Sequence, residues 1–175
     1  ATSDGSFLGT DASSGDVSLS FASTEVSEWR FSWGSGDFNP STANFISIVL
    51  MASAQPTAGI SGSTFTGYFL KLGDTGSGDQ IELWRKTGAG EVELGKFSTA
   101  SFGTGGLEDG INVKVTRDSS GVFELYYEVG FTYTNDPTTY AGALTNNTYT
   151  PSSYFGMNGD IGNPSADRRT YIDNI

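Results

Sequence analysis

The sequence predicts an all-β fold, a sandwich or barrel built from antiparallel strands. Short runs in which apolar and polar residues alternate recur along the whole chain, and this period of two is the signature of a half-buried strand. Among 175 residues there are 24 glycines and 13% aromatic residues but only 17% charged residues, a composition rich in strand and turn formers. No segment repeats the i, i+3, i+4 apolar spacing of a helix.

Residues 1–60 are expected to supply three strands. Residues before about Asp16 are rich in Ser, Gly and Asp and are expected to be loosely held, and alternation begins at residues 17–21. In residues 29–33 three aromatic side chains alternate with Arg30 and Ser32, so the aromatic side is predicted to face the core. Residues 45–51 are almost continuously apolar, which predicts a strand that is buried on both faces.

The rest of the chain is expected to continue in the same way. A Gly/Asp-rich turn at residues 73–80 predicts a hairpin between the strands on either side of it. A second turn, at residues 117–121, joins two further alternating segments. The strands predicted after residue 60 are 68–72, 81–85, 92–97, 111–115, 123–129, 154–157 and 170–175, which makes about ten in the chain.

Composition excludes several classes of function. There is no His and no Cys, so the chain has no Ser-His-Asp or Cys-His triad, no His or thiolate metal site and no disulfide. The net charge of −11 argues against nucleic acid and anionic membranes as partners. The longest apolar run is residues 48–52, too short for membrane insertion. We expect one domain over residues 1–175, a module of a larger secreted protein whose signal peptide has been removed.

Several segments together resemble a known family. They are 37–41 (DFNPS), 45–50 (FISIVL), 67–73 (GYFLKLG), 79–85 (DQIELWR), 113–118 (VKVTRD), 121–126 (GVFELY), 153–156 (SYFG) and 171–175 (YIDNI). In this order they resemble the concanavalin A-like (laminin-G, legume-lectin and glucanase-type) domains, most of all those in large secreted bacterial surface proteins. The resemblance implies a two-sheet antiparallel jelly-roll sandwich, a fold that carries lectins, glycosidases, lyases and adhesion modules.

Enzymatic activity is not expected. Glycosidases that share this resemblance use a Glu-x-Asp-x-x-Glu set or a near variant, whereas the closest spacings here are Glu91-Val92-Glu93 and Glu25 with Glu28. Glu124 and Glu128 share a strand face but would lie roughly 13 Å apart by strand rise, too far for either glycosidase geometry. Lyases of similar fold use a His, which this chain lacks. We therefore predict no catalytic residues.

Side-chain parity instead predicts a glycan-binding surface. On the strand 81–85, Ile81 and Leu83 are expected to face the core, which leaves Trp84 on the polar side, and Tyr126 is placed in the same way. Aromatic planes on such a surface stack on sugar rings while charged groups bond the hydroxyls. The predicted ligand-binding residues are Phe69, Lys71, Glu82, Trp84, Lys114, Glu124 and Tyr126. The alternative is that loops or a neighbouring domain cover these aromatic residues.

A structural calcium ion is the expected cofactor. Loop oxygens are available from Asp74, Asp79, Asn135, Asp136, Asn146, Asn147, Asp160, Asn163 and Asp167, although no stretch matches an EF-hand. Lectin-like sandwiches commonly hold a calcium ion near the chain ends, and this resemblance implies that Asp173 is a metal ligand.

These features predict a non-catalytic, lectin-like carbohydrate-binding module, located outside the cell or on its surface. Its partner would be a glycan or polysaccharide. One alternative is an adhesion or structural spacer module that contacts other surface proteins. A weaker alternative is a polysaccharide-degrading enzyme.

Overall fold

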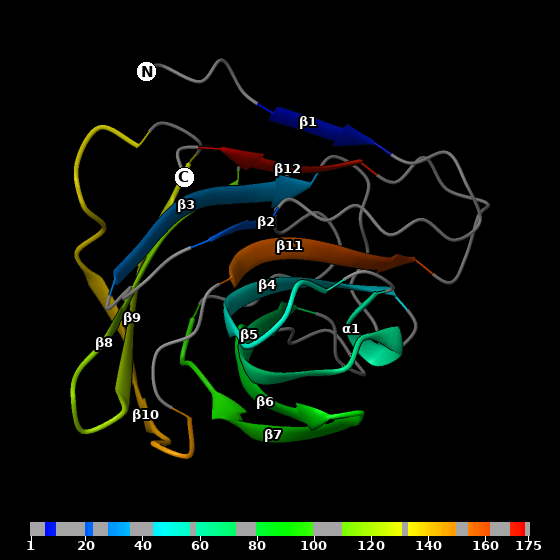
Figure 1. Ribbon diagram of the computed structural model, residues 1–175. Coiled ribbons are helices and arrows are strands. Elements are labelled where there is room, and N and C mark those ends of the chain that lie inside the picture. Colours follow the sequence, from blue (N-terminus) through cyan, green and yellow to red (C-terminus); the bar gives the residue numbers. More distant parts are fainter. Residues whose placement is uncertain are drawn as a thin grey trace.

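The chain forms a sandwich of two six-stranded antiparallel sheets, which confirms the predicted all-β architecture (Figure 1). The computed structural model describes residues 6–9, 20–22, 28–35, 44–56, 59–72, 80–99, 110–130, 133–149, 154–161 and 169–173. The helix found in these segments has four residues, so no described helix could cross a lipid bilayer.

One sheet, here the β8 sheet, contains six strands in the order β1-β12-β3-β8-β9-β10. Their bounds are β1 (Ser6–Gly9), β12 (Arg169–Asp173), β3 (Glu28–Ser35), β8 (Ile111–Arg117), β9 (Val122–Val129) and β10 (Thr139–Thr145). Strands that are neighbours in the chain, such as β8 and β9, pair through the predicted turn, whereas β3 and β8 are brought together from distant parts of the sequence.

The other sheet, here the β5 sheet, has the order β2-β11-β4-β5-β6-β7. Its strands are β2 (Ser20–Ala22), β11 (Tyr154–Ile161), β4 (Asn44–Ala52), β5 (Phe65–Leu72), β6 (Glu82–Gly88) and β7 (Gly90–Lys96). The predicted hairpin across residues 73–80 is the antiparallel pair β5–β6. The short helix α1 (Gly59–Gly62) lies between β4 and β5 in the chain.

Two strands have no counterpart among the predicted ones. Strand β1 lies in the Ser/Gly/Asp-rich segment before Asp16 and pairs with β12 over four residues. Strand β10 carries a register shift between Tyr140 and Gly142, and Gly142 has a positive φ of 122°. This bulge breaks the strict alternation on which the sequence prediction depends.

The main core lies between the two sheets. Trp29, Phe31 and Trp33 of β3 are almost wholly buried in it, as predicted. Tyr68, Leu70 and Leu72 of β5 and Ile81 and Leu83 near β6 face them from the other sheet. Burying each such side chain contributes about 1.5–3 kcal/mol, so this layer holds the sheets together.

A second, smaller core covers part of the outer face of the β5 sheet. Val49, Ala52, Ile60, Phe65 and Phe69 are buried there, and Trp84 and Tyr154 pack against them. Figure 1 shows α1, which carries Ile60, on the side of β4 and β5 that faces away from β8 and β9. The segment with α1 therefore covers part of this outer face.

One open end of the sandwich is closed by residues 146–149. The Tyr68 hydroxyl donates to Asn146 Oδ1 at 2.8 Å and accepts from the Tyr149 backbone N–H at 3.0 Å. Arg117 donates from Nη2 to the Tyr149 carbonyl oxygen at 2.9 Å, and its guanidinium lies over the Tyr68 ring. Tyr68, which is buried between the sheets, thus fixes a loop that follows β10.

Candidate functional site

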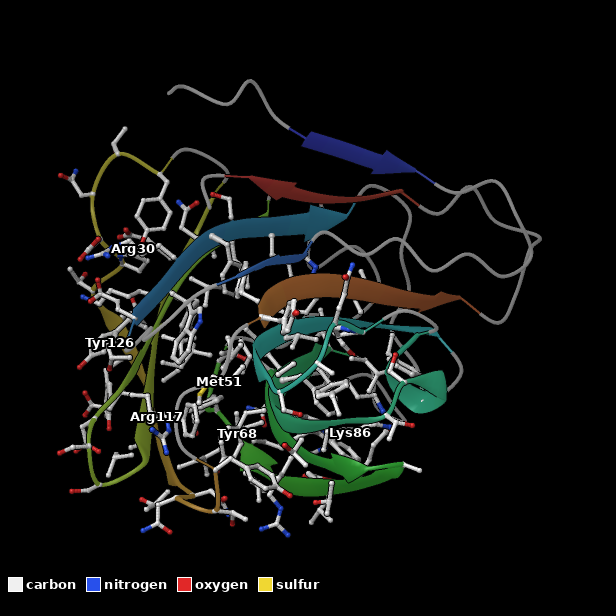
Figure 2. All side chains as sticks on the ribbon, in the orientation of Figure 1. Arg30, Met51, Tyr68, Lys86, Arg117 and Tyr126 are labelled. Atoms are coloured by element: carbon white, nitrogen blue, oxygen red, sulfur yellow. The ribbon has the colours of Figure 1, made fainter. Side chains whose placement is uncertain are left out.

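The seven predicted ligand-binding residues do not share one face, so the predicted single surface is wrong. Phe69, Lys71, Glu82 and Trp84 belong to the β5 sheet, whereas the other three residues, Lys114, Glu124 and Tyr126, belong to the β8 sheet. Figure 2 shows Tyr126 on one side of the molecule and Lys86 of β6 on the other, with Met51 between them. Each sheet of a sandwich has its own outer face, and parity along a strand does not distinguish the two.

The surface of the β5 sheet, here the Trp84 surface, is formed by Lys71, Glu82, Trp84 and Lys96. The register pairs Glu82 with Lys71 on one side and with Lys96 on the other, so the three charged residues form a row across β5, β6 and β7. Trp84 is the next outward residue on β6, and the register pairs it with Phe69. An indole therefore borders a row of charged groups.

The buried carboxylate of Glu82 contacts two neighbouring side chains of this surface. Its side chain is only 3% exposed, and both carboxylate oxygens have partners. Oε2 accepts a hydrogen bond from Trp84 Nε1 at 2.7 Å, and Oε1 lies 3.1 Å from Lys96 Nζ. These contacts fix the direction of the indole and leave Glu82 as a positioning residue.

Trp84 is held from a second side by Phe69. The two rings are stacked, with centroids 6.1 Å apart and an interplanar angle of 22°. Phe69 is 0% exposed, so it cannot contact a ligand, and its assignment as a ligand-binding residue is wrong. Phe69 is buried in a cluster with Ile60 of α1, whereas Trp84 is only partly buried.

Lys71 completes the Trp84 surface. Its Nζ lies 4.8 Å from the centroid of the Trp84 ring and 4.3 Å from that of Phe45. Cation–π contacts of this length are worth about 0.5–2 kcal/mol each. The ammonium group is therefore held at a fixed place beside the indole.

The surface of the β8 sheet, here the Tyr126 surface, is formed by Lys114, Glu124, Tyr126 and Tyr140. Lys114 Nζ lies 5.3 Å from the Tyr126 ring centroid, and Tyr140 packs on Tyr126 with centroids 5.3 Å apart. The Tyr126 hydroxyl donates to Glu124 Oε2 at 3.3 Å. Burial first, and then the Glu124 charge, raise the pKa of Tyr126. Tyr140 is 53% exposed and was missed because β10 was not predicted.

Asp136 attaches the loop before β10 to strands β3 and β8. Arg30 donates to it from Nε at 2.8 Å and from Nη2 at 3.0 Å, and Lys114 donates at 3.1 Å. Hydrogen bonds from Arg30 and Lys114 hold the pKa of Asp136 well below its usual range. In the same loop, burial raises the pKa of Tyr133 to about 12. Asp136 is thus paired with two cations.

The described residues do not supply a set of ligands for the predicted calcium ion. Asp173 is paired with Ser32 in the β12–β3 register, and its side chain lies outside the described residues. Next to it, Ser32 Oγ donates to Asn112 Oδ1 at 2.6 Å, and both of these side chains are buried. These are oxygen donors of the kind that calcium prefers. Within the described segments, however, no three acidic residues gather around one point. Asp74, Asp79, Asn163 and Asp167 fall outside these segments, as does the side chain of Asp160.

Two carboxylates near the Trp84 surface, those of Glu82 and Glu91, are engaged in structural contacts, whereas Glu93, which the register pairs with Trp84, is exposed. Glu91 Oε1 lies 3.0 Å from Nζ of Lys86, a lysine that is 0% exposed. Each Glu82 oxygen has one partner, Trp84 Nε1 or Lys96 Nζ. Glu82 and Glu91 are thus each held by a cation.

Comparison of the chain with known proteins identifies the fold. No family model matches the sequence, and no curated protein matches it. A legume lectin-like domain from Entamoeba histolytica superposes with a TM-score of 0.67 at 8% identity, over 99% of this chain and 82% of that one. The Emp47p carbohydrate recognition domain superposes with a TM-score of 0.58 at 13% identity, over 96% and 76% of the two chains. The concanavalin A-like jelly-roll fold implied by the sequence resemblance is therefore confirmed.

Proposed function

We propose that this chain is a non-catalytic, lectin-like carbohydrate-binding domain and that the glycan binds at the Trp84 surface. The observation that carries the proposal is the partly exposed indole of Trp84, fixed in direction by Glu82 and Phe69 on the outer face of the β5 sheet. The aromatic residues of β3, in contrast, are almost wholly buried between the sheets.

An indole held in this way suits a sugar ring. The apolar face of a pyranose packs against an aromatic plane, while charged groups at its rim bond the hydroxyls. Because Trp84 is already oriented by a hydrogen bond and by ring stacking, little side-chain entropy is lost when a ligand binds. Lys71 and Lys96 supply donors at the rim.

We propose that this surface binds without catalysis, for a chemical reason. Hydrolysis of a glycosidic bond needs an acid and a second carboxylate about 5–9.5 Å apart, each able to act on the substrate. Glu82 already accepts from Trp84 and Lys96, and Glu91 is paired with buried Lys86. Both carboxylates are better suited to hold the surface in place than to exchange protons.

The fold comparisons support the same function. Two structures of the same fold are a legume lectin-like domain and a carbohydrate recognition domain. By analogy with these neighbours, the partner of this chain would be a glycan, and the location that we propose, outside the cell or on its surface, rests on the sequence resemblance alone.

The test is a glycan array probed with the wild-type domain and with Trp84→Ala. We expect the variant to lose about 1–3 kcal/mol of affinity, the range for stacking of a base on an aromatic side chain. Tyr140→Ala is the matched control, since it removes an exposed aromatic residue from the opposite sheet. Glycan binding that Trp84→Ala leaves unchanged would contradict the proposal, as would the absence of any glycan ligand.

One observation favours an adhesion module as the second candidate. Tyr140 and Val129, which are 53% and 60% exposed, are large apolar side chains at the edge and end of the β8 sheet. Exposed aromatic residues are enriched at protein interfaces. If Tyr140→Ala abolished attachment to protein-coated surfaces while Trp84→Ala did not, this second function would be favoured.

A further inference from the structure

Lys71 differs from the other described lysines in having no acidic partner among the residues that the structure describes. Lys86 is paired with Glu91, Lys96 with Glu82 and Lys114 with Asp136, at 3.0–3.1 Å in each case. Nζ of Lys71 makes no hydrogen bond or ion pair with any residue of the described segments and contacts only the rings of Phe45 and Trp84. In a chain with 20 acidic and 9 basic residues, an unpaired lysine on a partly buried position is unexpected.

The acidic residue opposite Lys71 makes no ion pair with it. Glu82 faces Lys71 in the β5–β6 register, but its two oxygens contact Trp84 Nε1 and Lys96 Nζ. Glu93, which the register pairs with Trp84, makes no ion pair with Lys71 either. The three ammonium protons of Lys71 are therefore available to a ligand.

A second polar group beside Lys71 also lacks a partner. Ser47 lies opposite Lys71 in the β4–β5 register and is 0% exposed. Its Oγ has no hydrogen-bond partner. A buried hydroxyl without a partner costs about 1–3 kcal/mol, so a small movement that lets a ligand oxygen or a water reach it would recover that energy.

We propose that the glycan bound at the Trp84 surface is acidic, and that Lys71 binds its anionic group, a uronate carboxylate or a sulfate ester. This inference rests on the proposed function, because it requires the sugar ring to stack on Trp84. Nζ of Lys71 is 4.8 Å from the indole centroid, so a ring on the indole carries its substituents within reach of the ammonium group. Capture of an anion supplies the charge-assisted hydrogen bonds that this lysine lacks.

The experiment compares pairs of polysaccharides that differ only in charge. Polygalacturonate is measured against fully methyl-esterified polygalacturonate, and dextran sulfate against dextran, by calorimetry at low and moderate salt. We expect one charged member to bind at least tenfold more tightly than its neutral counterpart, and we expect salt to weaken that binding. The pair that shows the preference identifies the anion as a carboxylate or a sulfate.

Lys71→Met should reduce the affinity for the preferred charged polysaccharide by about tenfold or more, the loss of a hydrogen bond to a charged group. Binding of the neutral counterpart should change little. Lys71→Arg keeps the charge and should retain binding, and it serves as the second variant should Lys71→Met fail to fold. Lys114→Met is the matched control, because it removes the same charge from the opposite sheet.

The outcomes separate the two proposals. Equal binding of charged and neutral polysaccharides, lost in Trp84→Ala but not in Lys71→Met, would overturn the acidic-glycan inference and retain the lectin-like function. A charge preference that Lys114→Met removes as completely as Lys71→Met would also overturn the inference, since it would reflect the net charge of the domain. If no polysaccharide bound to the wild-type domain, both proposals would fail.

Discussion

The second core predicts that Phe69→Ala destabilises the domain and weakens glycan binding together. Phe69 is 0% exposed and packs on the outer face of the β5 sheet with Ile60 and Phe65, beneath the Trp84 ring. Replacing it leaves a cavity that separates the segment carrying α1 from the sheet. It also removes the ring on which Trp84 is stacked.

The expected loss of stability follows from the complete burial of the Phe69 side chain. Phe→Ala changes in a packed core cost about 3–5 kcal/mol. In a domain of 150–250 residues each kcal/mol lowers the melting temperature by about 2–4 °C, so a fall of roughly 6–20 °C is expected. Phe69→Leu, which keeps much of the volume, should cost far less.

The free energy of unfolding is measured by urea denaturation with tryptophan fluorescence as the probe, and the midpoints and slopes are compared. Tyr140→Ala is the control, since a side chain that is 53% exposed should change stability by little. If Phe69→Ala were as stable as Tyr140→Ala, the second core would not be packed. The argument that Phe69 positions Trp84 would then be refuted.

Three further measurements test other contacts. Tyr68→Phe should cost about 1–3 kcal/mol, because it leaves Asn146 Oδ1 and the Tyr149 N–H without their buried partner; an unchanged urea midpoint would contradict this. The raised pKa of Tyr133 means that the unfolded chain releases this proton first, so stability should fall between pH 10 and about 12. Tyr133→Phe should remove that part of the alkaline loss, and a pH profile identical to wild type would refute the assignment. If a calcium ion binds the folded state, EDTA should lower the melting temperature by several degrees, and no change would remove Asp173 from consideration as a ligand.

The sequence predicted the faces of individual strands well. Alternation placed Trp29, Phe31 and Trp33 in the core and Trp84 on the outside of β6, and the structure agrees on both. These predictions succeed because side chains on a strand point to opposite faces in turn, which is a local property of the backbone. Strand β10 escaped prediction where that local rule fails, at the bulge before Gly142.

The sequence predicted only some of the residues that form the Trp84 surface. Lys71, Glu82 and Trp84 lie on two successive strands of one hairpin, so parity alone could bring them together. The contact of Lys96 with Glu82 requires the register of β7 on β6, which includes a shift between Leu83 and Trp84. The burial of Phe69 could not be predicted, because it depends on Ile60, which packs in the same cluster from the segment that contains α1.

The amino-acid sequence by itself determined the fold class and the side of each strand that avoids water. Only the tertiary structure decided which sheet each strand joins, and hence that Trp84 and Tyr126 stand on opposite outer faces. The physical reason is that the alternation of apolar and polar residues distinguishes the core face of a strand from its outer face, whereas a sandwich has two outer faces, one on each sheet. Which of them a strand occupies is set by pairing between distant segments, such as β3 with β8 and β4 with β11, and no local pattern encodes that choice.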